Sequence, residues 1–100
     1  MIQHIVLFGI SKETPAEDLI KARNQLQALV GKIPGLISLK AETDMGIEGN
    51  CRLGLVAHLK DRLALDVFSK NSDHLAVADY ISRFRTSIAI IDYEVPDQLP

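Results

Sequence analysis

Three histidines, His4, His58 and His74, carry the side chains of this sequence that are best suited to moving a proton near neutral pH. An imidazole titrates at about pH 6.5, so one ring can remove a proton from a carbon acid and another can return it. His74 falls at the predicted start of a helix, which disfavours the imidazolium and favours a neutral base. We therefore take His4 and His74 as candidate catalytic residues. The structural alternative for each is a part-buried ring bonded to the backbone.

The third histidine and the single cysteine indicate neither a metal site nor a nucleophile. His58 has the opposite strand parity to Leu53, so we expect it on the other face of the sheet, in a structural role. The histidines form no close pair and share no helical face with a carboxylate, so no metal is predicted. Cys51 has no adjacent histidine or lysine to activate its thiol. Without a glycine-rich phosphate loop or an EF-hand pattern, the sequence predicts no cofactor.

Three further polar residues lie where they could serve a site. Asp92 shares its parity with the isoleucines before it, so its carboxylate either reaches inward to orient His4 or meets a lysine or arginine at the sheet end. Tyr93 points to the opposite face and is predicted at a dimer interface. Tyr80, on the last helix, could supply a hydroxyl to a pocket or could belong to the core and its rim.

The first ten residues, MIQHIVLFGI, position His4 and are typical of a strand that is apolar on both faces. Side chains alternate across a strand, so Val6 and Phe8 lie on the side of His4, and Ile5 and Leu7 lie on the other. Such a strand needs cover on both faces, and helices are expected to cover only one of them. The second cover is predicted to be another copy of the chain.

Hydrophobic periodicity predicts three helices and three further strands. The first helix is expected to start at Thr14, as its cap, and to end at Gly31. Asp61 is expected to cap a second, short helix, and Ser72 a third. The expected strands are 1–10, 36–44, 52–60 and 87–95.

The order β-α-β-β-α-α-β predicts an α+β fold, a ferredoxin-like sandwich with a four-stranded antiparallel sheet and helices on one face. Residues 1–96 are assigned to this domain and 97–100 to a C-terminal tail. Two copies pairing sheet to sheet would bury the second apolar face. We therefore predict a homodimer forming a dimeric α/β barrel. Its expected interface residues are Ile5, Leu7 and Tyr93.

Composition and charge exclude several other classes of function. The 100 residues include 11 basic and 13 acidic side chains, a net charge of −2, and no basic block. Nucleic acid and anionic membranes are therefore not expected as partners. There is no apolar run long enough to span a bilayer. The single cysteine favours a reducing compartment, so we expect a cytoplasmic protein.

Four segments share the order and spacing of a known family: MIQHIVLF at the N-terminus, Lys32–Gly35, Ser72–Val77 and Ile91–Val95. On these segments the sequence resembles the stress-responsive A/B barrel domain. The resemblance covers nearly the whole chain. It implies a dimeric α+β barrel with a pocket in each subunit, between the sheet and the later helices.

Most members of that family have no settled activity, and a few cyclise polyketide intermediates by acid/base chemistry. His4 and His74 match two histidines of those members. The positions of a further histidine and a tyrosine hold Leu53 and Phe68 here, which removes a donor for a developing oxyanion. The residues expected to line the pocket are Val6, Phe8, Leu53, Leu55, Phe68 and Tyr80.

Two functions follow as hypotheses. The first is a small homodimeric A/B barrel protein that binds a small apolar or aromatic molecule between sheet and helices. Its chemistry would be proton transfer or cyclisation, as in a polyketide-cyclase-like lyase or isomerase, with His74 as base and His4 as its partner. The second is a non-catalytic, stress-related dimerisation or interaction protein, which the apolar Leu53 and Phe68 favour.

Overall fold

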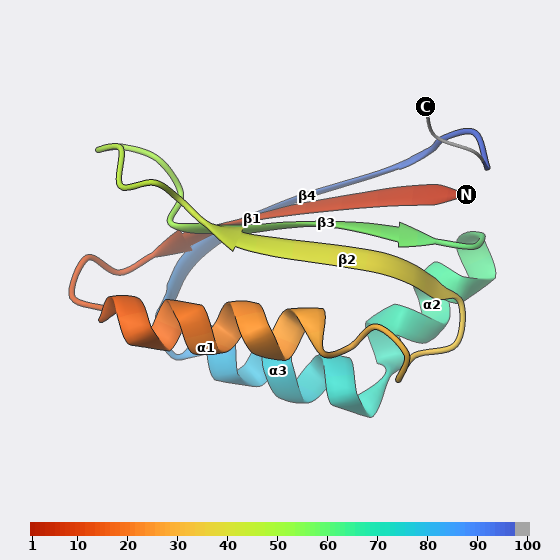
Figure 1. Cartoon of the computed structure of the whole chain (residues 1–100), viewed down its shortest axis with the longest axis horizontal. Helices are drawn as coiled ribbons and strands as arrows, with labels where there is room; N and C mark the ends of the chain where they lie inside the picture. Colours follow the sequence, from red (N-terminus) through yellow and green to blue (C-terminus); the bar gives the residue numbers. More distant parts are fainter. Residues whose placement is uncertain (98–100) are drawn as a thin grey trace.

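A computed structural model describes residues 1–97, and the last three residues of the predicted tail lie outside this range. A single antiparallel sheet carries three helices on one of its faces (Figure 1). This is the ferredoxin-like α+β fold predicted from the order of the elements. Those elements are β1 (Ile2–Ile10), α1 (Ala16–Gln27), β2 (Leu36–Thr43), β3 (Leu53–Leu59), α2 (Arg62–Lys70), α3 (Ser72–Ser82) and β4 (Arg85–Glu94).

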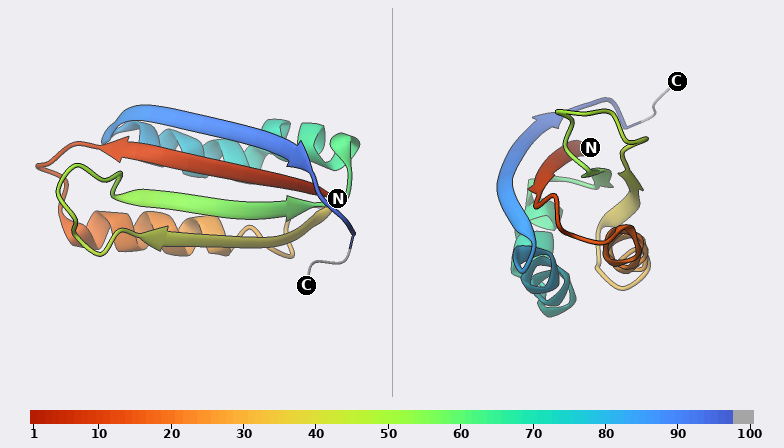
Figure 2. Two further views of the ribbon diagram at one scale, coloured as in Figure 1. Left: turned by 90° about the horizontal axis from the view of Figure 1, so that it is seen from above. Right: turned by 90° about the vertical axis from the view of Figure 1, so that its left-hand side faces the viewer.

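The register of β1 decides which side chains lie together on each face. The strand order is β2-β3-β1-β4, so β1 pairs with β3 on one side and with β4 on the other (Figure 2). Directly opposite residues of antiparallel strands project to the same face. His4 lies opposite Ala57 of β3 and Asp92 of β4. The even-numbered residues of β1 are buried beneath the helices, as the alternation predicted.

The helices bury apolar side chains against this inner face of the sheet. α1 contributes Leu19, Ala22 and Leu26, and α2 contributes Ala64 and Phe68. Full burial of one large apolar side chain contributes about 1.5–3 kcal/mol, so these contacts hold the helices on the sheet. The amphipathic spacing of the sequence already indicated this single buried face.

The two short helices are positioned by caps at their first turns. Asp61 caps α2 as predicted, since its Oδ1 accepts a hydrogen bond from the N–H of Ala64 at 2.8 Å. Ser72, however, does not cap α3. Asn71 does, and its Oδ1 accepts from the N–H groups of the second and third helix residues at 2.8 and 3.3 Å. Asn71 is the one residue between the two helices, with extended backbone, so it holds the cap position.

The prediction for the ends of α1 was wrong at both residues. Pro15, which has no hydrogen-bonding side chain, takes the N-cap position, and α1 begins at Ala16. Thr14 is buried instead and belongs to the preceding turn, where its N–H donates to the carbonyl of Ser11 at 3.1 Å. Gly31 lies four residues past the end of α1, in the following turns, with a φ of 90° that favours glycine.

β4 is exposed along its whole length, although it is fully paired with β1. Ile88 and Ile90 project to the helix side, yet 42% and 55% of their surfaces remain exposed. The helices therefore leave this edge of the inner face uncovered. The strand also begins at Arg85, two residues earlier than predicted.

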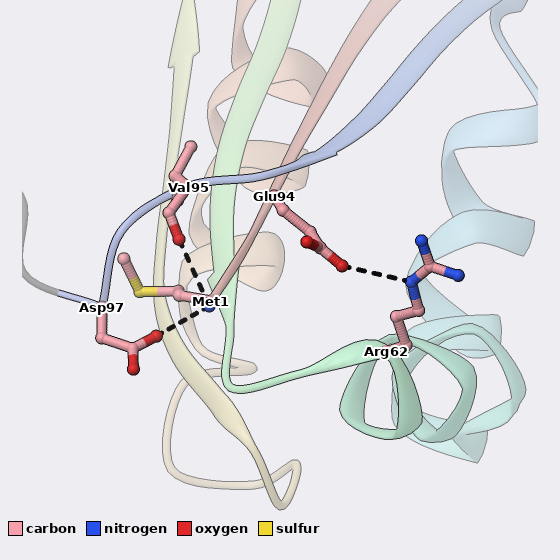
Figure 3. A network of polar contacts seen from close by, with 5 residues as sticks. All are labelled: Met1, Arg62, Glu94, Val95 and Asp97. Atoms are coloured by element: carbon pink, nitrogen blue, oxygen red, sulfur yellow. Dashed lines mark hydrogen bonds and ion pairs between the residues drawn. The ribbon is translucent and has the colours of Figure 1, made fainter.

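Polar contacts near the termini fix the far end of β4 (Figure 3). The N–H of Val95 donates to the carbonyl of Met1 at 2.9 Å, and the amino group of Met1 lies 2.9 Å from Oδ1 of Asp97. Arg62, at the start of α2, pairs with Glu94 at 3.4 Å. Both ion pairs include highly exposed carboxylates, so each adds little free energy. They connect the end of β4 to β1 and α2, while the strand pairing itself holds β4 beside β1.

Candidate functional site

His4 of β1 and Asp92 of the edge strand β4 form a close pair. His4 is 8% exposed, and its Nδ1 lies 2.5 Å from Oδ1 of Asp92. The pairing of β1 with β4 sets these residues directly opposite each other. A carboxylate accepts only, so the ring nitrogen donates and the neutral ring carries its proton on Nδ1. Of the two predicted roles for Asp92, the structure therefore shows the orientation of His4.

Phe68 of α2 contacts both candidate catalytic histidines. Its ring centroid lies 5.6 Å from that of His4, at an interplanar angle of 67°, and 4.2 Å from that of His74, at 36°. The Asp61 cap places Phe68, and the Asn71 cap bonds the backbone of His74. We call His4, Phe68 and His74 the ring cluster. Residues from β1, α2 and α3 thus meet at one point of the inner face.

The surroundings of His74 lower its pKa and so favour the neutral ring. Its Nδ1 is buried and has no hydrogen-bond partner within residues 1–97. Burial is the main cause that lowers the pKa of His74, and the nearby His4 ring acts in the same direction. The backbone of Ser69 acts weakly against both. The direction is the one expected from the sequence, but the main cause is burial rather than the helix start.

Most of the predicted pocket lining is packed inside the core. The side chains of Val6, Phe8, Leu53, Leu55 and Phe68 are all buried and belong to one apolar cluster. They fill the space between the sheet and the helices, where the pocket was predicted.

Tyr80 lies apart from the histidines in the contacts that the structure gives it. Its ring is 5.0 Å from Nζ of Lys21 and 5.7 Å from the guanidinium of Arg83. It also meets the edge of Phe84 at 5.4 Å. These contacts join α3 to α1, which agrees with the core or rim alternative given for Tyr80.

Ile88 and Ile90 are site candidates that the sequence analysis did not single out. They precede Asp92 on β4 at alternate positions, so they project to the same face as Asp92, opposite Phe8 and Val6 of β1. Their alternation with Asp92 was visible in the sequence. Their exposure was not, because an apolar strand residue is normally expected under a helix.

The outer face of the sheet carries the three predicted interface residues. Ile5 lies opposite Val56 and Ile91, and Leu7 lies two residues further along β1 with 48% of its surface exposed. Tyr93 is on the same face, opposite Gln3.

One hydrogen-bonded row of four side chains crosses this outer face, with one residue from each strand. Ser38 lies 2.9 Å from Nδ1 of His58, and Nε2 of His58 lies 2.7 Å from Oε1 of Gln3. Nε2 of Gln3 donates to the hydroxyl of Tyr93. Both nitrogens of the His58 ring are thus satisfied within the sheet, consistent with a structural role. We call these four residues the polar row.

The described part of the chain has no cluster suited to a metal ion. Within residues 1–97, no group of three or more histidine, cysteine, aspartate or glutamate side chains could hold one. Cys51 is exposed. No helix in the same range is long and apolar enough to cross a bilayer.

The sequence matches the Stress responsive A/B Barrel Domain, Dabb, over residues 2–95. This range contains the ring cluster, the polar row and all seven elements. The chain belongs to the Dabb family. No curated protein matches it.

Several solved structures share the fold of this Dabb protein. One is a dimeric ferredoxin-like protein of unknown function from Thermobifida fusca YX, with a TM-score of 0.84, 22% identity, and coverage of 94% of this chain and 90% of that chain. A second is a dimeric protein of unknown function from Bacteroides fragilis, with a TM-score of 0.80, 21% identity, and coverage of 94% and 95%. A third is the hydroxynitrile lyase of Passiflora edulis, with a TM-score of 0.80, 14% identity, and coverage of 99% and 96%. The same fold is thus found in at least one protein described as an enzyme.

Proposed function

We propose that this Dabb protein is a homodimer that binds a small apolar or aromatic molecule beside the ring cluster and transfers a proton on it. The observation that carries the proposal is the His4–Asp92 pair next to His74: the ring of Phe68 contacts both His4 and His74. Two imidazoles with different surroundings are the arrangement that acid/base chemistry needs.

His74 serves as the base in this proposal. Its lowered pKa favours the neutral ring at pH 7, and its buried Nδ1 has no hydrogen-bond partner within residues 1–97. His4 is the partner that gives a proton, and for this step its ring is the imidazolium, with a hydrogen on Nε2 as well as on Nδ1; exchange with solvent then restores both rings. Asp92 holds its Nδ1–H and stabilises the imidazolium, so Nε2 is the nitrogen left for chemistry. His74 takes a proton from the bound molecule and His4 gives one to it, so the molecule must reach both rings beside Phe68.

The inner face of β4 supplies the apolar surface for this molecule. Ile88 and Ile90 are exposed next to Asp92 on the same strand and face. Phe68 and Leu53 offer no hydroxyl or imidazole to an oxyanion, so the substrate must delocalise its own negative charge. An aldol-type cyclisation or a proton shift next to a carbonyl meets this requirement.

The outer face is the proposed surface for homodimerisation. Ile5, Leu7 and Ile91 form an apolar area with no cover from the helices. Similar structures described as dimeric support a second copy as its occupant. Tyr93, at one end of the polar row, accepts from Gln3, so its own O–H is free to donate to the partner.

The experiment is native mass spectrometry of the protein purified without denaturation, with His74→Ala and Ile90→Asp as variants. We expect a dimer that retains a small molecule, which Ile90→Asp loses. Leu63→Asp, on the outer surface of α2, is the matched control. If His74→Ala leaves both ligand binding and every assayed turnover unchanged, the acid/base role fails.

The second candidate function is a non-catalytic, stress-related interaction dimer. The observation that favours it is the filled core, in which Leu53 and Phe68 occupy the positions of a histidine and a tyrosine in the polyketide-cyclising members. A dimer that retains no small molecule and shows no binding at Ile90 would support this alternative.

A further inference from the structure

A hollow lies at the other end of β1 from His4, and it shares no residue with the ring cluster. It has a volume of about 650 Å³, between the start of α1 and the loop that joins β2 to β3. Ile10 and Leu19 are among its lining residues. Ile10 lies six residues, or roughly 20 Å, along β1 from His4. Ligand pockets in proteins commonly have volumes of about 300–1,000 Å³. The hollow is therefore large enough for a small molecule.

The loop above this hollow is held in shape by Asp44. One carboxylate oxygen, Oδ2, accepts from the N–H groups of Gly46 and Ile47, both at 2.8 Å, and Oδ1 accepts from Nδ2 of Asn50 at 3.0 Å. These hydrogen bonds lower the pKa of Asp44, so the carboxylate is ionised at neutral pH. The loop is thus organised before any ligand binds.

The same loop leaves two large apolar side chains in solvent at the hollow. Met45 is 86% exposed and Ile47 is 54% exposed, and both line the hollow. A hydrogen-bonded loop that presents apolar side chains to a concave surface favours an occupant with an apolar part.

Arg52 supplies a charge without a carboxylate partner. Its side chain is half-buried and lines the hollow, and its Nη1 donates to the carbonyl of Ser11 at 3.0 Å. Asp44 lies next to it, and the backbone N–H of Asp44 donates a hydrogen bond to the carbonyl of Arg52 at 2.9 Å. Yet the carboxylate of Asp44 is committed to its own loop, and Arg52 makes no ion pair within residues 1–97.

A half-buried guanidinium favours an anionic partner, and its planar fork suits a carboxylate in particular. Lys12 lines the same hollow and adds a second positive charge, while Glu48, also in the lining, is an exposed negative charge. We propose that this hollow binds a small amphipathic carboxylate, with its acid group on Arg52 and its apolar part against Met45 and Ile47. The ligand class differs from that of the ring cluster, so neither proposal depends on the other.

The test is an NMR titration of the ¹⁵N-labelled full chain with sodium octanoate, and in parallel with 1-octanol as the uncharged match. We expect saturable shifts of the amides of residues 44–52 with octanoate and weaker binding of octanol. Arg52→Gln should weaken octanoate about tenfold and leave octanol unchanged. Arg83→Gln, which removes an arginine that packs on Tyr80, should change neither affinity.

Two results would overturn the proposal. One is the absence of saturable shifts at residues 44–52, including the case in which octanoate shifts only β4. The other is an equal loss of both ligands in Arg52→Gln, which would mean that Arg52 acts only through its bond to Ser11. Ile47→Ser keeps that bond and should weaken both ligands; unchanged binding in this variant would also contradict the site.

Discussion

His4 and His58 lie on neighbouring strands of one sheet, on opposite faces, and their surroundings differ in kind. His58 has both ring nitrogens engaged by neutral side chains of the polar row. His4 has a carboxylate on one nitrogen and an aromatic ring at its edge. A fully engaged imidazole holds strands together, whereas a ring fixed at one nitrogen keeps the other for chemistry. The outer face of the sheet therefore has a histidine suited to a structural role, and the inner face has one suited to proton transfer.

The largest effect is expected where the inner face is packed. Phe68→Ala should lower the free energy of unfolding by about 3–5 kcal/mol, because it leaves a cavity in the core. Urea denaturation measures this loss. Phe84→Ala removes a ring that is only partly buried and should cost clearly less. Equal losses would mean that the ring cluster is not a packed centre.

Next in size is the effect on the outer face. Leu7→Asp should weaken dimerisation by at least about 3 kcal/mol, because it buries an unpaired charge at the proposed interface. Leu75→Asp is the matched control, since Leu75 is 51% exposed on α3 and Leu7 is 48% exposed on β1. Sedimentation equilibrium gives both constants. A wild-type chain with a mass near 11 kDa at micromolar concentration would contradict the dimer.

Asp92→Asn should cost about 1 kcal/mol of stability, because a charge-assisted hydrogen bond becomes a neutral one. It should also change the tautomer of His4, since an amide NH₂ can donate to Nδ1 where the carboxylate only accepts. Thermal unfolding and the ¹⁵N shifts of the ring measure the two effects. Glu94→Gln, which removes an exposed carboxylate two residues on, should leave the His4 ring unchanged.

The smallest effect is the pH dependence that His74 contributes. Folding lowers its pKa below the ordinary value of 6.5, so the unfolded chain binds the proton more tightly. The stability from neutral His74 is complete above about pH 6.5 and is lost as the pH falls from there toward the lowered value. Between pH 7.5 and 5.5 the wild type should therefore lose more stability than His74→Gln. Parallel curves in urea denaturation would show that burial does not affect His74.

The faces of β1 could be predicted from the sequence because a strand has a strict period of two. Because His4 alternates with the apolar residues that face the helices, the same period predicted His4 on the helix side. The same period placed Asp92 opposite, but only the pairing of β1 with β4 decided between its two partners. The cap of α3 was harder, because Asn71 and Ser72 are adjacent and both are good caps.

The shape of the site could not be read from residue types. Leu53, Leu55 and Phe68 suit a pocket wall and a filled core equally well, and the volume between sheet and helices decides which of these they form. Exposure of Ile88 and Ile90 depends on how far the helices extend over β4, which no local pattern records. The hollow at residues 44–52 was likewise hidden, since its glycines indicated only a loop.

The most direct test of the contrast between the two faces is the ¹⁵N NMR spectrum of the three histidine side chains between pH 8 and pH 5. At pH 8 we expect a neutral His4 with its proton on Nδ1, because Asp92 accepts it, and a neutral His58 with its proton on Nε2, because Gln3 accepts it. As the pH falls, we expect His74 to take up its proton at a lower pH than a free imidazole does, because burial lowers its pKa. The same tautomer at His4 and His58, or a His74 whose pKa is not lowered, would contradict this contrast.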